Sequence, residues 1–215
     1  MQLDIISDPV CPWCYVGKKR MEIAIAARPA MQIDLAYRVF QLNPDMPREG
    51  MDRKEHMRRK FGEAKAPSGM ADALAAAGRE LGIEFNFSLI QRTPNTVDAH
   101  RLIRWSHNAG LQAELVENMF RRYFTDGDDI GDHSVLLDIA RDTGLDTDII
   151  GDLLARDSDM DLIREEDATA RRIGIQGVPS YVIANKYLLV GAQEPEILGK
   201  ALDTAYAEAQ QSAAG

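Results

Sequence analysis

The chain begins with a short segment in which apolar and polar residues alternate. This pattern, in QLDII at residues 2–6, is typical of a β-strand, and it returns with β-branched and aromatic residues in QIDLAYRVFQL at residues 32–42. Between them, residues 14–27 place apolar side chains at helical spacing. Pro12 suits the first turn of that helix, because a missing backbone N–H costs nothing there. The sequence therefore predicts a strand, a helix that begins next to Cys11, and a second strand.

From residue 51 to about residue 174 the pattern is helical. Apolar residues recur three and four positions apart in segments bounded by capping residues and glycines, and Ser158 is the expected cap of the last segment. The clearest of these segments are residues 68–82, 95–110, 111–124, 133–144, 147–155 and 158–174. After Gly174 two further strands, in SYVIAN and YLLVGA, precede a closing helix that begins at Glu194.

This order of elements predicts an α/β chain with a thioredoxin-like fold and a large all-helical insertion. Residues 1–50 supply a parallel unit with a crossover helix, and residues 175–215 supply a hairpin and a helix. Together these two segments are expected to form the thioredoxin-like domain, and residues 51–174 the inserted helical domain.

Composition and charge narrow the classes of function. The 215 residues can bury a core without covalent help, and the formal net charge of −9 argues against a nucleic-acid partner, because phosphate binding needs a basic surface. Residues 52–65 carry more basic than acidic side chains, but their mixed signs at helical spacing indicate a solvated helix face. No apolar run reaches membrane-spanning length, and the first residues lack the features of a secretory signal. We therefore expect a cytoplasmic protein with no membrane partner.

Both cysteines of the chain, Cys11 and Cys14, lie in SDPVCPWCYVG at residues 7–17. A disulfide staple, half of a metal site and a redox pair would each use such spacing. A chain of this length needs no staple, and the cytoplasm keeps structural thiols reduced. Zinc would need two more ligands, and no tight pairing occurs among the four histidines, which are His56, His100, His107 and His133. We therefore expect no metal and favour a redox pair.

The two cysteines are expected to have different roles. A thiol at the start of a helix faces unpaired backbone N–H groups and the positive end of the helix dipole, and both favour the thiolate. Cys11 is therefore the expected nucleophile. Cys14 lies one turn later on the same face, so it can attack a mixed disulfide formed at Cys11 and release the substrate.

The segment GIQGVPSYVI places Val178 and Pro179 directly before a predicted strand. Pro179 is compatible with two interpretations. A trans proline can begin a strand, where its missing donor is harmless, and a cis proline can turn the loop back toward the thiols. The residues alone favour the trans form, because cis bonds are a small minority of X-Pro bonds.

Taken together, these motifs resemble the DsbA family of thiol-disulfide oxidoreductases. SDPVCPWCYVGKKR, TPNTVDAHRLIRW and GVPSYVI, followed by VGAQ, are similar to the FrnE-like cytosolic branch and follow the expected order from residue 7 to residue 193. The resemblance implies a thioredoxin fold, disulfide exchange with protein or small-molecule thiols, and a cis Pro179. It also implies that Val178 offers backbone groups to a substrate beside Cys11.

The residues between the cysteines set this chain apart from the periplasmic oxidants of the family, which carry histidine there. Trp13 cannot hold a thiolate as an imidazolium does, so we expect weaker oxidising power. Its indole either forms a flat apolar contact for substrate or packs over the insertion. Pro12 and Trp13 are thus expected to contact substrate, with no bound cofactor and with glutathione as a conceivable redox partner.

Asn95 and His100 are the remaining candidates for substrate binding. Each also has a structural interpretation, Asn95 as a helix cap after Pro94 and His100 as a packing residue. The resemblance implies that their segment faces the groove of the active site.

Two alternatives to a disulfide oxidoreductase stay open. One is a glutathione-dependent isomerase or transferase of the 2-hydroxychromene-2-carboxylate isomerase or kappa-class type, in which serine occupies the nucleophile position. The other is a non-catalytic module that binds peptides along the Val178 edge.

Overall fold

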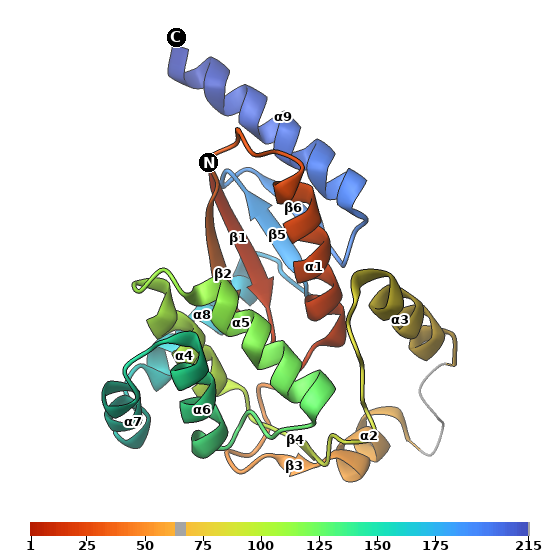
Figure 1. Cartoon of the computed structure of the whole chain (residues 1–215), viewed down its shortest axis with the longest axis vertical. Helices are drawn as coiled ribbons and strands as arrows, with labels where there is room; N and C mark the ends of the chain where they lie inside the picture. Colours follow the sequence, from red (N-terminus) through yellow and green to blue (C-terminus); the bar gives the residue numbers. More distant parts are fainter. Residues whose placement is uncertain (63–67, 215) are drawn as a thin grey trace.

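The computed structural model describes residues 1–62 and 68–214, and Figure 1 shows the arrangement of its elements. The central sheet has the strand order β2-β1-β5-β6. β1 and β2 are parallel, and β5 pairs antiparallel with both β1 and β6. The four strands are β1 (Gln2–Ser7), β2 (Asp34–Val39), β5 (Ser180–Ile183) and β6 (Tyr187–Val190). All four lie inside or within one residue of the predicted segments.

Two helices cover one face of this sheet. α1 (Pro12–Ala26) connects β1 to β2, and α9 (Pro195–Ala214) follows β6 and packs against α1. Leu3 and Ile5 of β1 point into the core on this side, because alternate residues of a strand face the same way. They are buried there with side chains of both helices, including Val16, Met21 and Leu198.

The opposite face of the sheet is covered by helices from the insertion. α8 (Met160–Arg172) packs Ala170 against Ile6 of β1 and Phe40. α4 (Val97–His107) adds a second small cluster, in which Val97 meets Val39 at the end of β2. The thioredoxin-like fold with a helical insertion, predicted from the order of elements, is confirmed.

The insertion lies at the end of the sheet toward which β1 runs, the lower end in Figure 1. A two-stranded ribbon of β3 (Met51–Asp52) and β4 (Arg92–Thr93) belongs to it. Its other elements are α2 (Arg53–Phe61), α3 (Ser68–Leu81), α5 (Gln112–Arg121), the π-helical turn η1 (Arg122–Asp126), α6 (His133–Thr143) and α7 (Thr147–Ala155).

Two contacts join the insertion to the sheet and to α1. Gln112 of α5 accepts a hydrogen bond from the Tyr37 N–H at 2.8 Å and donates one to the Tyr37 carbonyl at 3.3 Å, which satisfies backbone groups at the outer edge of β2. Tyr15 of α1 stacks on Phe120 of α5 with ring centroids 5.0 Å apart. The first turns of α1 therefore pack between the sheet and the insertion.

The structure differs from the sequence predictions at a few places. β3 and β4 were not predicted, because two-residue strands carry no detectable alternation. Asp159 rather than Ser158 occupies the N-cap of α8, and its positive φ of 64° gives the chain a tight turn there. The last residues of the basic segment 52–65, from 63 onward, lie outside the described residues. Within the part that is described, no helix combines the length and the apolar composition needed to cross a membrane.

Candidate active site

The two cysteines lie at the first turn of α1. The chain leaves β1 at Ser7, and Cys11 takes the N-cap position in an extended conformation, with Pro12 in the first turn. The Cys11 N–H donates to the Asp8 carbonyl at 2.9 Å, and the Cys14 N–H donates to the Cys11 carbonyl at 3.0 Å. Cys11 therefore occupies the helix start predicted from the sequence.

The loop before β5 packs against this turn. Both cysteines are free thiols, and the Cys11 Sγ lies 3.8 Å from the Val178 carbonyl oxygen, to which it donates a weak hydrogen bond. The Val178–Pro179 peptide bond is cis. Within the described part of the chain, the Val178 N–H has no hydrogen-bond partner. One backbone donor thus remains beside Cys11 for another molecule.

Cys14 is the more deeply placed thiol, with 2% of its surface exposed. Burial, and then its interactions with the Cys11 sulfur, raise the pKa of the Cys14 thiol well above its usual range, although the Ser7 hydroxyl and the Asp8 backbone act in the opposite direction. The Cys14 thiol therefore keeps its proton at neutral pH. This difference suits the resolving role expected from its position.

Asp8 holds the loop that leads to Cys11. Its carboxylate is fully buried and accepts hydrogen bonds from the N–H of Leu42 at 2.7 Å and of Val10 at 3.4 Å. A buried carboxylate is stable only when its oxygens have such partners. Asp8 therefore fixes the β1–α1 loop to the segment that follows β2.

A mostly apolar cavity of about 480 Å³ opens beside Cys11. Pro12 and Trp13 form the wall next to the thiol, and Trp13 is also packed against the main core. The insertion and the segment after β2 supply the remaining walls, among them Leu42, Asn43, Met57, Phe61, Ala71, Leu74, Phe87, Thr93 and Tyr123.

The side of this cavity formed by α2 is basic. Arg53, His56 and Lys60 line it from successive turns of the helix. Partial burial lowers the pKa of the His56 imidazole, and the neighbouring charges of Lys60, Arg53 and Arg59 lower it further. His56 is therefore neutral at pH 7, while the other two side chains are cationic.

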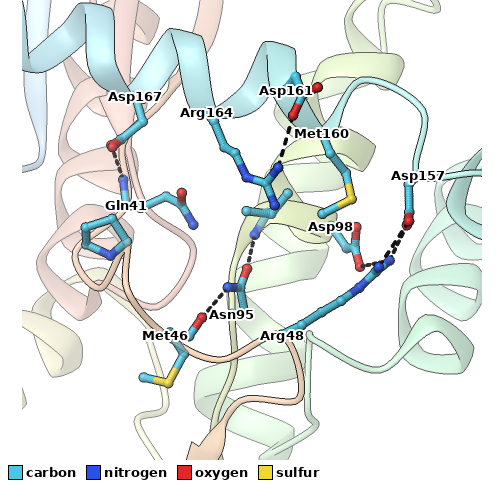
Figure 2. A pocket seen from close by; sticks show the side chains of 12 residues that line it. Gln41, Met46, Arg48, Asn95, Asp98, Asp157, Met160, Asp161, Arg164 and Asp167 are labelled. Carbon is cyan, nitrogen blue, oxygen red and sulfur yellow. Dashed lines mark hydrogen bonds and ion pairs between the residues drawn. The ribbon is translucent and has the colours of Figure 1, made fainter.

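Asn95 and His100 are not brought to the thiols. Asn95 donates to the Met46 carbonyl at 2.6 Å and accepts from the Val97 N–H at 2.9 Å, which satisfies the start of α4. It lines a separate polar cavity of about 590 Å³, in which Arg48 and Asp157 face each other (Figure 2). The structure thus supports the capping interpretation of Asn95.

His100 is a buried packing residue of α4. Its Nε2 lies 3.2 Å from the Phe40 carbonyl oxygen and 3.7 Å from an Asp8 carboxylate oxygen. It supports the Asp8 loop from behind and does not line the cavity beside Cys11. Of the segment TPNTVDAH at residues 93–100, Thr93 lines the cavity beside Cys11, whereas Asn95 and His100 do not.

Residues that could ligate a metal are not gathered at this site. Over residues 1–62 and 68–214, no group of three or more histidine, cysteine or acidic side chains is close enough to hold an ion.

The fold and the paired thiols at the start of α1 define a thioredoxin-like dithiol protein. The family model of the DSBA-like thioredoxin domain matches residues 2–203, so the chain belongs to this family. A probable DsbA oxidoreductase from Streptomyces coelicolor is 30% identical in sequence, with a TM-score of 0.85 over 97% of this chain and 91% of that one.

Two further solved structures share the fold at lower identity. A 2-hydroxychromene-2-carboxylate isomerase has a TM-score of 0.72 and 14% identity, over 99% of this chain and 98% of that one. The cytosolic disulfide reductase DsbM from Pseudomonas aeruginosa, solved with GSH, has a TM-score of 0.61 and 16% identity over 100% of both chains.

Sequence reasoning missed several residues of the site. No local feature of the sequence singles out Asp8, because an aspartate after a strand is common in turns and its burial depends on the segment around Leu42. The basic side chains of α2 were assigned to a solvated face. Their spacing at positions 53, 56, 57, 60 and 61 would have indicated one helix face, although not which part of the fold that face contacts.

Proposed function

We propose that this chain is a thiol-disulfide oxidoreductase of the FrnE-like type, in which Cys11 attacks and Cys14 resolves. The observation that carries the proposal is the position of Cys11, at the start of α1, beside an open cavity and 3.8 Å from the Val178 carbonyl oxygen. A reducing compartment would keep both thiols ready for this reaction, and we propose the cytoplasm as its location.

The exchange has two steps. The Cys11 thiolate forms a bond to one sulfur of the substrate disulfide while the substrate S–S bond breaks, and the released thiolate takes a proton from water. Cys14 then attacks the Cys11 sulfur while its proton passes to the departing substrate sulfur, which releases the second substrate thiol and leaves a Cys11–Cys14 disulfide. Two electrons pass from the protein dithiol to the substrate, and the reverse sequence oxidises a substrate dithiol.

The neighbourhood of the thiols supports this division of roles. The raised pKa of Cys14 keeps it from competing with Cys11 for the first attack, since the thiolate is the reactive form. We assign the Val178 N–H, which has no partner among the described residues, to binding the backbone of an extended peptide next to Cys11. Pro12, Trp13, Val178 and Pro179 are accordingly the residues that we assign to substrate contact.

A glutathione-dependent isomerase is the second candidate. The shared fold with the 2-hydroxychromene-2-carboxylate isomerase and the size of the cavity favour it. Such a reaction would need one nucleophile position and would not depend on Cys14. The two candidates therefore differ in what a change at Cys14 does.

The Cys14→Ser variant separates these possibilities. After incubation with a peptide disulfide, we expect a lasting mixed disulfide at Cys11, detected by mass spectrometry, because no second thiol of the chain can resolve it. The matched Cys11→Ser variant should form far less adduct, and the unchanged chain should pass on to its internal disulfide.

Absence of an adduct at Cys11 in Cys14→Ser, in a folded sample, would contradict the redox proposal. Full glutathione-dependent isomerisation by the same variant would favour the second candidate. Peptide binding without any adduct would point to the non-catalytic module.

A further inference from the structure

One face of α2 forms the outer wall of the Cys11 cavity. Arg53, His56, Met57, Lys60 and Phe61 all line it, and their spacing of three and four residues places them on one side of the helix. Met57 and Phe61 extend the apolar wall, while Arg53 and Lys60 add positive charge to it. This face therefore combines apolar contact with two permanent cations.

The charge of this wall is not neutralised within the cavity. No acidic residue lines the cavity in the described part of the chain. Arg53 lies 3.5 Å from the Tyr123 hydroxyl and over the Phe87 ring, and neither of these groups carries a negative charge. Among the described residues, neither Arg53 nor Lys60 forms an ion pair.

The acidic side chain that α2 does contain is occupied elsewhere. Glu55 bonds to Arg58 at 2.6 Å and to Arg59 at 2.7 Å, on the side of the helix away from the cavity. Among the described residues, Arg58 and Arg59 of this helix thus form ion pairs, whereas Arg53 and Lys60 on the cavity face form none. This contrasts with the formal charge of −9 of the whole chain.

The two cations share a cavity with the thiol that is proposed to react. Cys11, Arg53 and Lys60 line the same cavity of about 480 Å³. A disulfide in this cavity with one sulfur at Cys11 can place its remaining atoms against α2. The partly apolar surroundings strengthen the attraction between these cations and an anionic group.

We propose that the α2 wall selects disulfides that carry a carboxylate close to the reacting sulfur. This inference rests on the thiol-disulfide exchange proposed above and names the class of substrate for that site. Cys11 attacks the sulfur of the anionic disulfide, and Arg53 and Lys60 bind its carboxylates. The released product is a carboxylate-bearing thiol, and the two electrons come from the Cys11–Cys14 dithiol.

Three small disulfides with equal spacing between sulfur and terminal group provide the test. Dithiodipropionate is anionic, 2-hydroxyethyl disulfide is neutral, and cystamine is cationic. Each is mixed with the fully reduced protein, and the single-turnover rate of dithiol oxidation is followed, so no external reductant is required. Each rate is divided by that of a neutral model thiol with the same disulfide, which removes differences in intrinsic reactivity.

We expect the normalised rate at low salt to be about tenfold higher for the anionic than for the neutral disulfide, and lowest for the cationic one. The preference should shrink severalfold at 0.5 M salt, because screening acts over a few ångströms there. Arg53→Gln combined with Lys60→Gln should abolish the preference for the anionic disulfide. Lys54→Gln combined with Arg58→Gln removes the same charge from other positions of α2 and should leave most of this preference in place.

The outcomes distinguish this inference from the proposed function. Equal normalised rates for the three disulfides would overturn the inference alone, as would an equal loss of preference in both double variants. No exchange with any of the three would overturn the proposed function and this inference with it. If the double variant at Arg53 and Lys60 fails to fold, the decrease of the anionic preference at high salt in the unchanged protein still tests the inference.

Discussion

Gly17 lies where the helix that carries the thiols packs closely against Pro179 and Tyr181. A Cβ atom at this position would lie 2.3 Å from the Tyr181 hydroxyl oxygen and 2.7 Å from Cγ of Pro179. Tyr181 has no exposed surface, so its ring has little freedom to move away. We therefore expect Gly17→Ala to destabilise the protein and to displace Pro179.

The size of the effect follows from two opposing contributions. Alanine is favoured over glycine inside a helix by about 1 kcal/mol, and forcing an extra methyl group into a packed core costs about 1 to 3 kcal/mol. Gly151→Ala in α7 gains the same helix propensity, but its Cβ would meet only Leu137, at 3.8 Å. The free energies of unfolding of the two variants should therefore differ by about 1 to 3 kcal/mol, with Gly17→Ala the less stable.

Urea unfolding followed by far-UV circular dichroism measures this difference. Tyr181→Phe adds a second check, because the Tyr181 hydroxyl is buried without a hydrogen-bond partner in the described part of the chain. Its removal alone should be close to neutral or stabilising, and it should recover part of the cost of Gly17→Ala. Our reasoning would be refuted if Gly17→Ala stabilised the protein as much as Gly151→Ala, or if Tyr181→Phe recovered nothing.

Two other predictions concern groups that titrate. Because the pKa of Cys14 is raised, the folded state holds this proton longer than the unfolded chain, so the reduced protein should lose stability above pH 8.5, by up to about 1.4 kcal/mol per pH unit. Urea unfolding at pH 8.5 and 9.5 should show a shallower loss in Cys14→Ser, and equal slopes would contradict the assignment. Burial opposes the charge of Glu117, but its interactions with Lys18, Lys19 and Tyr15 outweigh burial and lower the pKa of this carboxyl. The contribution of Glu117 to the free energy of unfolding is therefore present above about pH 4.3 and is lost as the pH falls below that value. Glu117→Gln should lower the free energy of unfolding by about 1 to 3 kcal/mol at pH 7, since it removes a charged partner 2.7 Å from the buried Lys18. Urea unfolding of this variant should also depend less on acid pH, and an unchanged acid profile would count against this role of Glu117.

The strands and most helices could be predicted from the sequence because each has a local cause. Alternation in residues 2–6 and the proline after Cys11 specify β1 and the start of α1. The spacing of the two cysteines placed both thiols on one turn. These features depend on neighbours in the chain, which a sequence displays directly.

The rest of the site depends on contacts between distant segments. The cavity brings Cys11 together with α2 and with Tyr123 of η1, and no local pattern specifies which helix faces it. Asn95 and His100 show the opposite case. Both lie in a segment that matches the family motif, yet Asn95 bonds to the start of α4 and His100 to the Phe40 carbonyl oxygen.

The stacking of Tyr15 on Phe120 has a consequence for anyone who would shorten this protein. Tyr15 follows Cys14 directly, and its hydroxyl also donates to Glu117 of α5 at 2.9 Å. Excision of the helices between β2 and α8 would uncover this ring and leave the neighbouring Lys18 without one of its two carboxylate partners. A minimal version of the redox domain would therefore need a redesigned outer surface on α1, close to the residues that carry the thiols.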